Sequence, residues 1–263
     1  MGTYTGTDGN DSITPVILSG GVVADPLGTT PGAGSDTLMG KGGDDLLDGD
    51  GGNDLLIGGD GNDRLLGQPG SDEVRGLKGD DNLRGGPDDD VVNGGGGNDY
   101  LVGASGNDRL LGKNGSDELR GLRGDDNLEG GNGRDTLEGG DGDDLLWGGQ
   151  GDDRLVGQDG ADVFLFTSLE DSGPSGDERD QILGFGWGKD VLDFSAIDAI
   201  EGEKGNQAFS LDEDGSFSAG EIRLREVKAG LNVELNVDGD AEADMAILLK
   251  VFDGRLTDDD FMF

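Results

Sequence analysis

The nine residues GGDGDDLLW at positions 139–147 are one unit of a repeat that decides the fold of this chain. Fifteen such units follow one another from Pro31 to Leu165 without an insertion. Position six is aspartate in every unit, position eight is Leu, Val or Phe in every unit, and glycine dominates positions one and four. A compositional bias without register would not keep two positions this constant, so the nine-residue period reflects structure.

Each unit predicts a tight turn followed by a short strand. Glycines permit positive φ in the first six residues, and residues seven to nine form a strand whose middle side chain points inward. Two units close one coil of eighteen residues, and successive coils stack. The predicted fold is therefore all-β: a parallel β-roll, a right-handed β-helix solenoid, with the position-eight side chains as its internal core.

Composition excludes many functional classes. The 263 residues include no cysteine and no histidine, which excludes disulfide frameworks, thiolate or histidine metal sites, and catalytic triads that need these residues. The 58 acidic and 19 basic residues give a formal net charge of −39, which disfavours binding to nucleic acid or to an anionic membrane surface. No apolar run approaches the ~20 residues that span a bilayer.

The predicted core is too thin to hold the roll by itself. Burying one leucine contributes about 2–3 kcal/mol, whereas ordering nine residues costs about 1–2 kcal/mol each. Every coil also stacks two aspartates on those of the coil below, and their charges repel. A hard divalent cation between turns would relieve both problems, and Ca²⁺ accepts oxygen ligands that include backbone carbonyls.

The repeat resembles the repeats-in-toxin (RTX, haemolysin-type) calcium-binding nonapeptides, which form a parallel β-roll. Units such as Gly58–Leu66 match the consensus G-G-x-G-x-D-x-U-x, where U is apolar, at every defining position. In that family, calcium is held by the position-six carboxylate and by the backbone carbonyls of positions two and four. The resemblance implies as carboxylate ligands Asp36, Asp45, Asp54, Asp63, Asp72, Asp81, Asp90, Asp99, Asp108, Asp117, Asp126, Asp135, Asp144, Asp153 and Asp162. It implies as carbonyl ligands Gly43, Gly52, Gly59, Gly61, Gly70, Gly79, Gly95, Gly97, Gly106, Gly115, Gly124, Gly131, Gly133, Gly140, Gly142, Gly149, Gly151 and Gly160.

Some turns depart from the consensus. A carbonyl ligand tolerates any side chain, but positive φ is costly outside glycine, so weaker binding is expected at units with another residue at position two. These residues are Lys41, Gln68, Leu77, Ala104, Lys113, Leu122 and Gln158. Each inter-turn site pairs a unit with the one two units on, so fifteen units allow at most thirteen calcium ions, which would bring the net charge from −39 to −13.

The two edges of the roll are expected to differ, because successive units alternate between them. Units starting at Gly40 and every eighteen residues to Gly148 share one edge, where four units carry the full Gly-Gly-x-Gly-x-Asp turn. The opposite edge has one, at Gly139, because Asp88 replaces the position-four glycine of another unit. We expect the Gly40-to-Gly148 edge to be more regular and better occupied by calcium.

The sequence divides into three parts. Residues 1–30 form an N-terminal cap with a loop and one detached unit, Gly6–Thr14, in which Asp11 and Ile13 take the constant places. Residues 31–165 form the roll, and residues 166–263 form a mostly β domain with alternating segments. These segments are 190–194, 221–225, 231–237 and 246–251.

The third part resembles the C-terminal domain that follows the repeats in serralysin-type secreted metalloproteases. The matching stretches are Gly160–Phe166, Asp180–Phe185, Gly188–Phe194, Ala219–Leu224 and Val237–Asp244. The zinc site of those proteases needs histidines, and this chain has none, so protease activity is excluded. Paired carboxylates are inevitable among 58 acidic residues, and no aromatic cluster accompanies them, so we expect no enzyme activity.

Two acidic stretches lie outside the repeats. Ser210–Glu221 has the spacing of an EF-hand loop, but it begins with Ser and Gly205 disfavours a leading helix, so an acidic hairpin turn is the favoured interpretation. Asp238, Asp240, Glu242 and Asp244 form a second acidic cluster, which is either a calcium site, with the three aspartates as ligands, or a solvated turn.

The last six residues, Asp258–Phe263, are acidic and then apolar. This pattern resembles the uncleaved C-terminal export signal of type I secretion substrates, and the amino terminus has no secretory signal. The resemblance implies a secreted, extracellular protein whose partners are calcium and the type I secretion apparatus.

We interpret the chain as a monomeric, non-enzymatic calcium-binding β-roll with a structural or interaction role. The alternatives are the secretion and folding module of a larger enzyme, of metalloprotease or alginate-epimerase type, and a membrane-active protein. Leu145, Trp147, Val163 and Leu165 point outward on adjacent strands. We expect the C-terminal domain to dock on this apolar patch; the alternative is that the patch is a surface for another protein.

Overall fold

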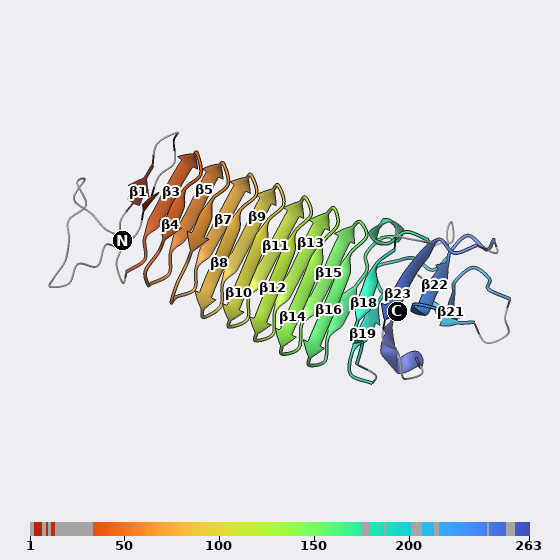
Figure 1. Ribbon diagram of the computed structural model, residues 1–263. Coiled ribbons are helices and arrows are strands. Elements are labelled where there is room, and N and C mark those ends of the chain that lie inside the picture. Colours follow the sequence, from red (N-terminus) through yellow and green to blue (C-terminus); the bar gives the residue numbers. More distant parts are fainter. Residues whose placement is uncertain are drawn as a thin grey trace.

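A computed structural model of the chain shows a long two-sheet solenoid closed at its C-terminal end by a compact part within residues 166–263, which we call the cap (Figure 1). The structure describes residues 3–6, 9, 12–13, 34–174, 179–186, 188–200, 207–212, 216–240, 242–250 and 256–263. The roll is built of parallel β-coils. Within the described ranges, the only helical pieces are two 3₁₀ turns of the C-terminal part, η1 (Leu169–Asp171) and η2 (Asp258–Asp260). The all-β parallel β-roll predicted from the sequence is confirmed.

The first sheet has eleven strands, in the order β1-β3-β5-β7-β9-β11-β13-β15-β17-β19-β24. We call it sheet A. Its strands are β1 (Thr3–Thr5), β3 (Thr37–Gly42), β5 (Leu55–Asp60), β7 (Glu73–Lys78), β9 (Val91–Gly96), β11 (Arg109–Asn114), β13 (Asn127–Asn132), β15 (Leu145–Gln150), β17 (Val163–Leu165), β19 (Val191–Asp193) and β24 (Phe261–Met262).

The second sheet, sheet B, has thirteen strands, in the order β2-β4-β6-β8-β10-β12-β14-β16-β18-β23-β22-β21-β20. Its strands are β2 (Ser12–Ile13), β4 (Leu46–Asp48), β6 (Arg64–Leu66), β8 (Asn82–Pro87), β10 (Tyr100–Ser105), β12 (Glu118–Arg123), β14 (Thr136–Asp141), β16 (Arg154–Asp159), β18 (Gln181–Leu183), β20 (Ser210–Leu211), β21 (Glu221–Val227), β22 (Gly230–Asn236) and β23 (Met245–Lys250).

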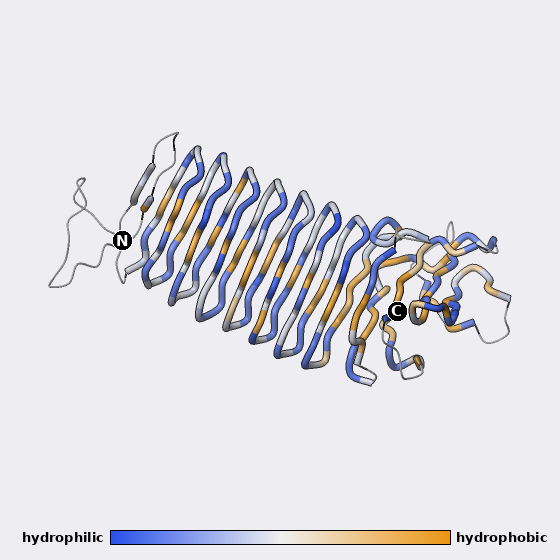
Figure 2. The backbone as a smooth tube through the Cα atoms, in the orientation of Figure 1, coloured by the Kyte–Doolittle hydropathy of each residue, from blue (hydrophilic) through white to orange (hydrophobic). Residues whose placement is uncertain are grey.

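The register of both sheets follows the eighteen-residue coil. Leu128 pairs with Leu146 in sheet A, and Leu119 pairs with Leu137 in sheet B. Every position-eight side chain from Leu38 to Phe164 is fully buried, so the two sheets share one apolar ladder as their core. Figure 2 shows apolar residues recurring in the strands of each coil and hydrophilic residues around them.

The strands on the Gly40-to-Gly148 edge are the more regular, as expected. All strands from β3 to β15 in sheet A have six residues and run on into the turns of that edge. In sheet B, strands β4 and β6 have only three residues each. After β4 the backbone N–H of Asp50 turns to the Asp48 carboxylate, and after β6 Pro69 has no N–H to donate.

The detached N-terminal unit stacks on the first coil of the roll. Its strand β2 pairs with β4, so Ile13 lies opposite Leu47, and β1 pairs with β3. Asp11 lies outside the described residues. The unit thus continues both sheets, although a long stretch of sequence separates it from the next unit.

The C-terminal part continues both sheets as well, a connection that the sequence did not predict. Strands β18 and β19 pair with β16 and β17, β23 pairs with β18, and β24 ends sheet A. The antiparallel strands β21, β22 and β23 confirm three alternating segments of the sequence. Phe166 and Phe194 stack with ring centroids 5.4 Å apart, and their cluster joins the apolar ladder. Backbone pairing, more than the patch, therefore joins cap and roll.

The predicted apolar patch is nevertheless covered in part by the cap. Residues 167–171 fold over β15, where Ser168 caps η1 and the indole Nε1 of Trp147 donates to Asp171 Oδ2 at 3.1 Å. Trp147 and Leu145 are half-buried. No helix among the described residues has the length and apolar character needed to cross a membrane.

Candidate metal centre

The position-six aspartates form two buried rows along the roll, one at each edge. Each aspartate ends a turn and precedes a strand, and all fifteen are buried, with exposures from 0% to 7%. We call these the aspartate rows. The first row is Asp36, Asp54, Asp72, Asp90, Asp108, Asp126, Asp144 and Asp162; the second is Asp45, Asp63, Asp81, Asp99, Asp117, Asp135 and Asp153.

From Asp54 to Asp162, one carboxylate oxygen of each row aspartate accepts a hydrogen bond from the preceding turn. The backbone N–H of Asp36 donates to Asp54 Oδ1 at 2.7 Å, and that of Asp54 donates to Asp72 Oδ1 at 2.7 Å. The bond recurs every eighteen residues in both rows, at 2.7 to 3.1 Å. The sequence placed these side chains in register, and this bond orients them.

The other oxygen has no hydrogen-bond partner. From Asp45 to Asp162, every row member has a buried Oδ2 atom without a partner. A buried carboxylate oxygen without a donor is costly, and a bound cation is the ordinary remedy. The residues present therefore fit a calcium ion, which takes oxygen ligands only.

Burial raises the pKa values of the row aspartates from Asp54 to Asp162. Burial raises the pKa of Asp90 to about 8, against the lowering effect of the backbone hydrogen bond from Asp72, and the nearby Asp108 charge adds to the rise. Burial likewise raises the pKa of Asp126 to about 7 and that of Asp54 to about 6. Without a cation, the folded roll thus opposes the ionisation of its own ligands.

The glycines that the family resemblance implied as carbonyl ligands all adopt positive φ, as the turn requires. They are Gly43, Gly52, Gly59, Gly61, Gly70, Gly79, Gly95, Gly97, Gly106, Gly115, Gly124, Gly131, Gly133, Gly140, Gly142, Gly149, Gly151 and Gly160, with φ from 90° to 154°. A Cβ atom added at Gly59 would lie 2.0 Å from the Lys41 carbonyl oxygen, and one at Gly61 would lie 2.1 Å from that of Gly43. The carbonyls of positions two and four therefore point into the gap between turns.

These gaps contain more acceptors than donors. Within residues 34–174, no hydrogen bond ends on the carbonyl oxygen of a position-four glycine. The described residues contain no group of three acidic side chains that could hold a metal ion. A cation in this roll would thus be held by single carboxylates and backbone carbonyls, the kind of ligand set that the family resemblance implied.

The residues that replace glycine at position two adopt the same backbone. Lys41 has φ of 88° and Ala104 of 109°, and Gln68, Leu77, Lys113, Leu122 and Gln158 lie between 76° and 89°. Asp50, a further non-glycine residue at position two, has φ of 69°, and Asp88, at position four, has φ of 80°. Asp88 therefore keeps the path of the turn that its side chain was expected to disrupt, because aspartate tolerates this conformation.

Two aspartates of the cap extend the rows and were missed in the sequence. The backbone N–H of Asp153 donates to Asp180 Oδ1 at 2.8 Å, and that of Asp162 donates to Asp190 Oδ1 at 3.1 Å. Asp180 Oδ2 is buried without a partner, and burial raises the pKa of Asp180 well above its usual range. Asp190 Oδ2 accepts the Gly186 N–H. Both segments, DQIL and DVLD, carry the D-x-U pattern. Gly186 and Gly188 take positions two and four before Asp190, a signal that could have identified it, whereas before Asp180 only Gly176 takes a matching place.

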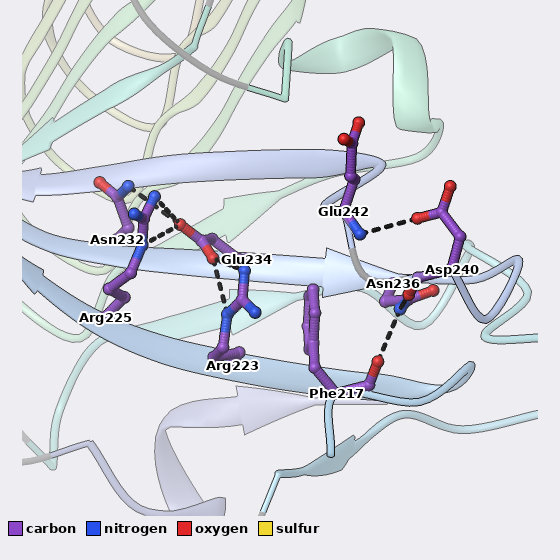
Figure 3. Close-up of polar contacts among 8 residues, drawn as sticks. All are labelled: Phe217, Arg223, Arg225, Asn232, Glu234, Asn236, Asp240 and Glu242. Atoms are coloured by element: carbon purple, nitrogen blue, oxygen red, sulfur yellow. Dashed lines mark hydrogen bonds and ion pairs between the residues drawn. The ribbon is translucent and has the colours of Figure 1, made fainter. Parts of the chain in front are cut away.

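Asp238, Asp240 and Asp244 are not brought together as a cluster of ligands. Asp238 Oδ1 accepts the Asp240 N–H at 2.9 Å, and Asp244 Oδ2 accepts the Val237 N–H at 2.7 Å. Figure 3 shows Asp240 bound to the backbone of Glu242. These carboxylates support the turn between β22 and β23. The EF-hand-like stretch Ser210–Glu221 lies partly outside the described residues, at 213–215.

The cap also buries an ion-paired glutamate (Figure 3). Glu234 is 1% exposed and accepts hydrogen bonds from Arg223 Nε at 2.9 Å and Arg225 Nε at 2.7 Å. Burial alone would raise the pKa of Glu234, but the hydrogen bonds from Arg223, Asn232 and Arg225 outweigh it and lower the pKa. The Arg223 guanidinium lies 3.8 Å from the Phe217 ring centroid. This cluster joins β21 to β22.

A family model described as "RTX calcium-binding nonapeptide repeat (4 copies)" matches residues 30–65, 66–101, 102–137 and 129–164. Among solved structures, the AlgE6R3 subunit of the Azotobacter vinelandii mannuronan C5-epimerase is similar, with 25% identity over 67% of this chain and 79% of that one, at a TM-score of 0.34. The AlgE6R2 subunit of the same epimerase is 25% identical over 72% of this chain and 91% of that one, at a TM-score of 0.37. No curated protein matches the chain.

Proposed function

The chain belongs to the family of RTX calcium-binding nonapeptide repeat proteins, and from this premise we propose that it is a secreted, non-enzymatic, monomeric protein whose roll folds on extracellular calcium. One observation carries the proposal. Each aspartate of the rows from Asp54 to Asp162 is buried with one carboxylate oxygen unpartnered, and burial opposes its ionisation. Such a structure needs a cation at neutral pH.

The residues of each turn have distinct parts in holding calcium. The row aspartate supplies Oδ2, and positions two and four supply carbonyls that lie between the turns. The bound ion supplies positive charge where two stacked turns bring carboxylates together. Since the net charge is −39, calcium also reduces the repulsion that opposes a compact chain.

Calcium availability would then decide where the protein folds. Extracellular calcium modules bind with dissociation constants of about 10⁻⁴–10⁻³ M, so cytosolic calcium would leave the chain unfolded and fit for export. The acidic-apolar end Asp258–Phe263 would be read by the type I secretion apparatus in that unfolded state. External calcium would fold the chain after export, and the cap, which shares both sheets with the roll, would fold with it.

Calcium titration of the full chain, followed by far-UV circular dichroism and calorimetry, tests this function. We expect a disordered spectrum in EDTA, a cooperative gain of β signal between about 0.1 and 1 mM calcium, and several ions bound per chain. Magnesium at the same concentration is the control, because it demands near-octahedral geometry and dehydrates reluctantly. A strong β signal in EDTA, or a magnesium response equal to that of calcium, would contradict the proposal.

A further inference from the structure

A second row of side-chain hydrogen bonds runs along the outside of the turns, at position five. The Asn62 N–H donates to Asp44 Oδ1 at 2.9 Å, and the Asp80 N–H donates to Asn62 Oδ1 at 2.9 Å. Asn98 and Ser116 continue this series, which lies on the Gly40-to-Gly148 edge. On the opposite edge the same bond links Ser71 to Asn53, Asn107 to Asp89, Asp125 to Asn107, Asp143 to Asp125 and Ala161 to Asp143. We call these bonds the outer ladder.

The hydrogen bonds of the outer ladder and those of the aspartate rows run in opposite directions along the roll. A position-five oxygen accepts the N–H of the following turn, as Asn98 accepts from Ser116 at 2.8 Å. A position-six oxygen accepts the N–H of the preceding turn, as Asp117 accepts from Asp99 at 2.8 Å. Where both occur, they bind the same two turns from both sides.

The outer ladder requires no cation. Its side chains are exposed, and asparagine and aspartate both serve in it. Each N–H it satisfies belongs to the residue directly before a row aspartate. Its bonds therefore hold the turn spacing next to the carbonyls and carboxylates that face the gap.

The ladder depends on the length of the side chain. Every asparagine or aspartate at position five from Asp44 to Asp143 accepts the N–H of the following turn. Serine reaches less far: Ser116 Oγ is 3.4 Å from the Arg134 nitrogen. No such bond is made between Ser71 and Asp89 in the described roll. The Arg134 side chain carries only donors, so it cannot accept the N–H of the following turn, and it forms an ion pair with Asp152 instead.

We propose that the position-five asparagines and aspartates are positioning residues that set the turn spacing for calcium, so that gaps bounded by serine or arginine at this position bind calcium most weakly. The inference rests on the proposed function, since it concerns calcium affinity. Among the described turns, the gaps without a ladder bond are those between the turns of Ser35 and Asn53, of Ser71 and Asp89, and of Arg134 and Asp152. The gap between the turns of Ser116 and Arg134 has only the 3.4 Å bond and is weak for the same reason.

Three single substitutions in the full chain test this. Asn98→Ser shortens a ladder acceptor, Ser71→Asn supplies a missing one, and Asn93→Ser is the matched control on the neighbouring strand β9, where the side chain makes no ladder bond. Calorimetric calcium titration should show the affinity of one class of sites fall roughly two- to tenfold for Asn98→Ser and rise by a similar factor for Ser71→Asn, the effect of one hydrogen bond. Asn93→Ser should match the parent.

Amide hydrogen exchange at saturating calcium gives a local readout. The Ser116 N–H should lose protection in Asn98→Ser, and the Asp89 N–H should gain it in Ser71→Asn, while amides of the strands keep theirs. Equal affinities in Asn98→Ser and Asn93→Ser, or no gain in Ser71→Asn, would overturn the inference while leaving calcium binding intact. A parent protein that binds no calcium would remove the proposed function and this inference together.

Discussion

At the residue scale, the roll depends on the missing Cβ atom of glycine and on the two carboxylate oxygens of aspartate. Glycine at position four leaves room for a carbonyl of the preceding turn, and the row aspartate carries one bonded and one unpartnered oxygen. The fold thus concentrates acceptors in the gaps between turns. Two predictions follow from these atoms.

Gly61→Ala should destabilise the calcium-bound protein far more than Gly184→Ala. Both glycines have positive φ, at 134° and 74°, and this alone costs alanine about 1–2 kcal/mol. A Cβ at Gly61 would also meet the Gly43 carbonyl oxygen at 2.1 Å, whereas nothing lies within 4 Å at Gly184. Thermal unfolding of both variants in saturating calcium, with the number of bound ions, checks the difference. Similar losses in both would show that the carbonyl contact is unimportant.

Acid should stabilise the calcium-free roll. Between the ordinary pKa of 3.8 and raised values of about 6 to 8, the folded chain holds protons that the unfolded chain releases, so its stability falls as pH rises through this window. We expect more β signal in calcium-free buffer at pH 5 than at pH 8. Calcium affinity should change the other way, because protons compete for the carboxylates. A calcium-free β signal that grows with pH would contradict this.

At the element scale, strand pairing connects the roll to the cap. The cap joins the roll through β18 and β19, and Asp180 and Asp190 carry the aspartate rows across that joint. The edges also differ in the length of the strands that lead into them. Each feature leads to one prediction.

Asp180→Asn should have opposite effects with and without calcium. Asparagine keeps an oxygen for the Asp153 N–H but removes the buried charge, so the calcium-free protein should gain stability. With calcium, the joint should lose a ligand, the melting temperature should fall, and the fluorescence of Trp147 should shift to the red as η1 loosens. Asp159→Asn, at an exposed position three of the roll, is the control. A loss of stability in both conditions would mean that the carboxylate acts without calcium.

The Gly40-to-Gly148 edge should be the better occupied. Its turns follow six-residue strands throughout, whereas those after β4 and β6 on the other edge follow strands of three residues. At limiting calcium, anomalous scattering from crystals should show stronger metal peaks along the first edge. Equal peaks on both edges would contradict this prediction.

At the scale of the whole molecule, one apolar ladder and two sheets run from the N-terminal unit to the last strand. The final residues take part in this. Phe261 is buried, and its ring stacks with Phe194 at 6.3 Å between centroids. The segment proposed as an export signal is therefore also the end of sheet A.

Deleting residues 258–263 should impair export and folding separately. We expect loss of secretion from cells that carry a type I apparatus, and a lower melting temperature of the protein refolded in calcium, because β24 and its aromatic stack are lost. Phe261→Ala is the control: it weakens the stack, as large-to-small core changes do by about 3–5 kcal/mol, but leaves the acidic residues in place. Normal secretion of the truncated chain would exclude this segment as the signal.

The sequence by itself determined the coil, the ladder core and the two aspartate rows of this protein. Position eight from Leu38 to Phe164 and position six from Asp36 to Asp162 recur with a fixed period, and stacking converts a period into contacts between neighbours eighteen residues apart. The positive φ of residues such as Lys41 also followed from the pattern, because the path of the turn is common to all units.

Only the tertiary structure decided what aperiodic segments do. Asp180 and Asp190 join the rows across separations of 27 and 28 residues, and Ile13 pairs with Leu47, 34 positions later in the sequence. Both follow because backbone pairing at a sheet edge accepts any strand with an apolar residue in register. The outer ladder likewise depends on how far a side chain reaches between turns. Such contacts depend on which atoms lie close together in the folded chain, and the nine-residue period of the sequence does not specify this.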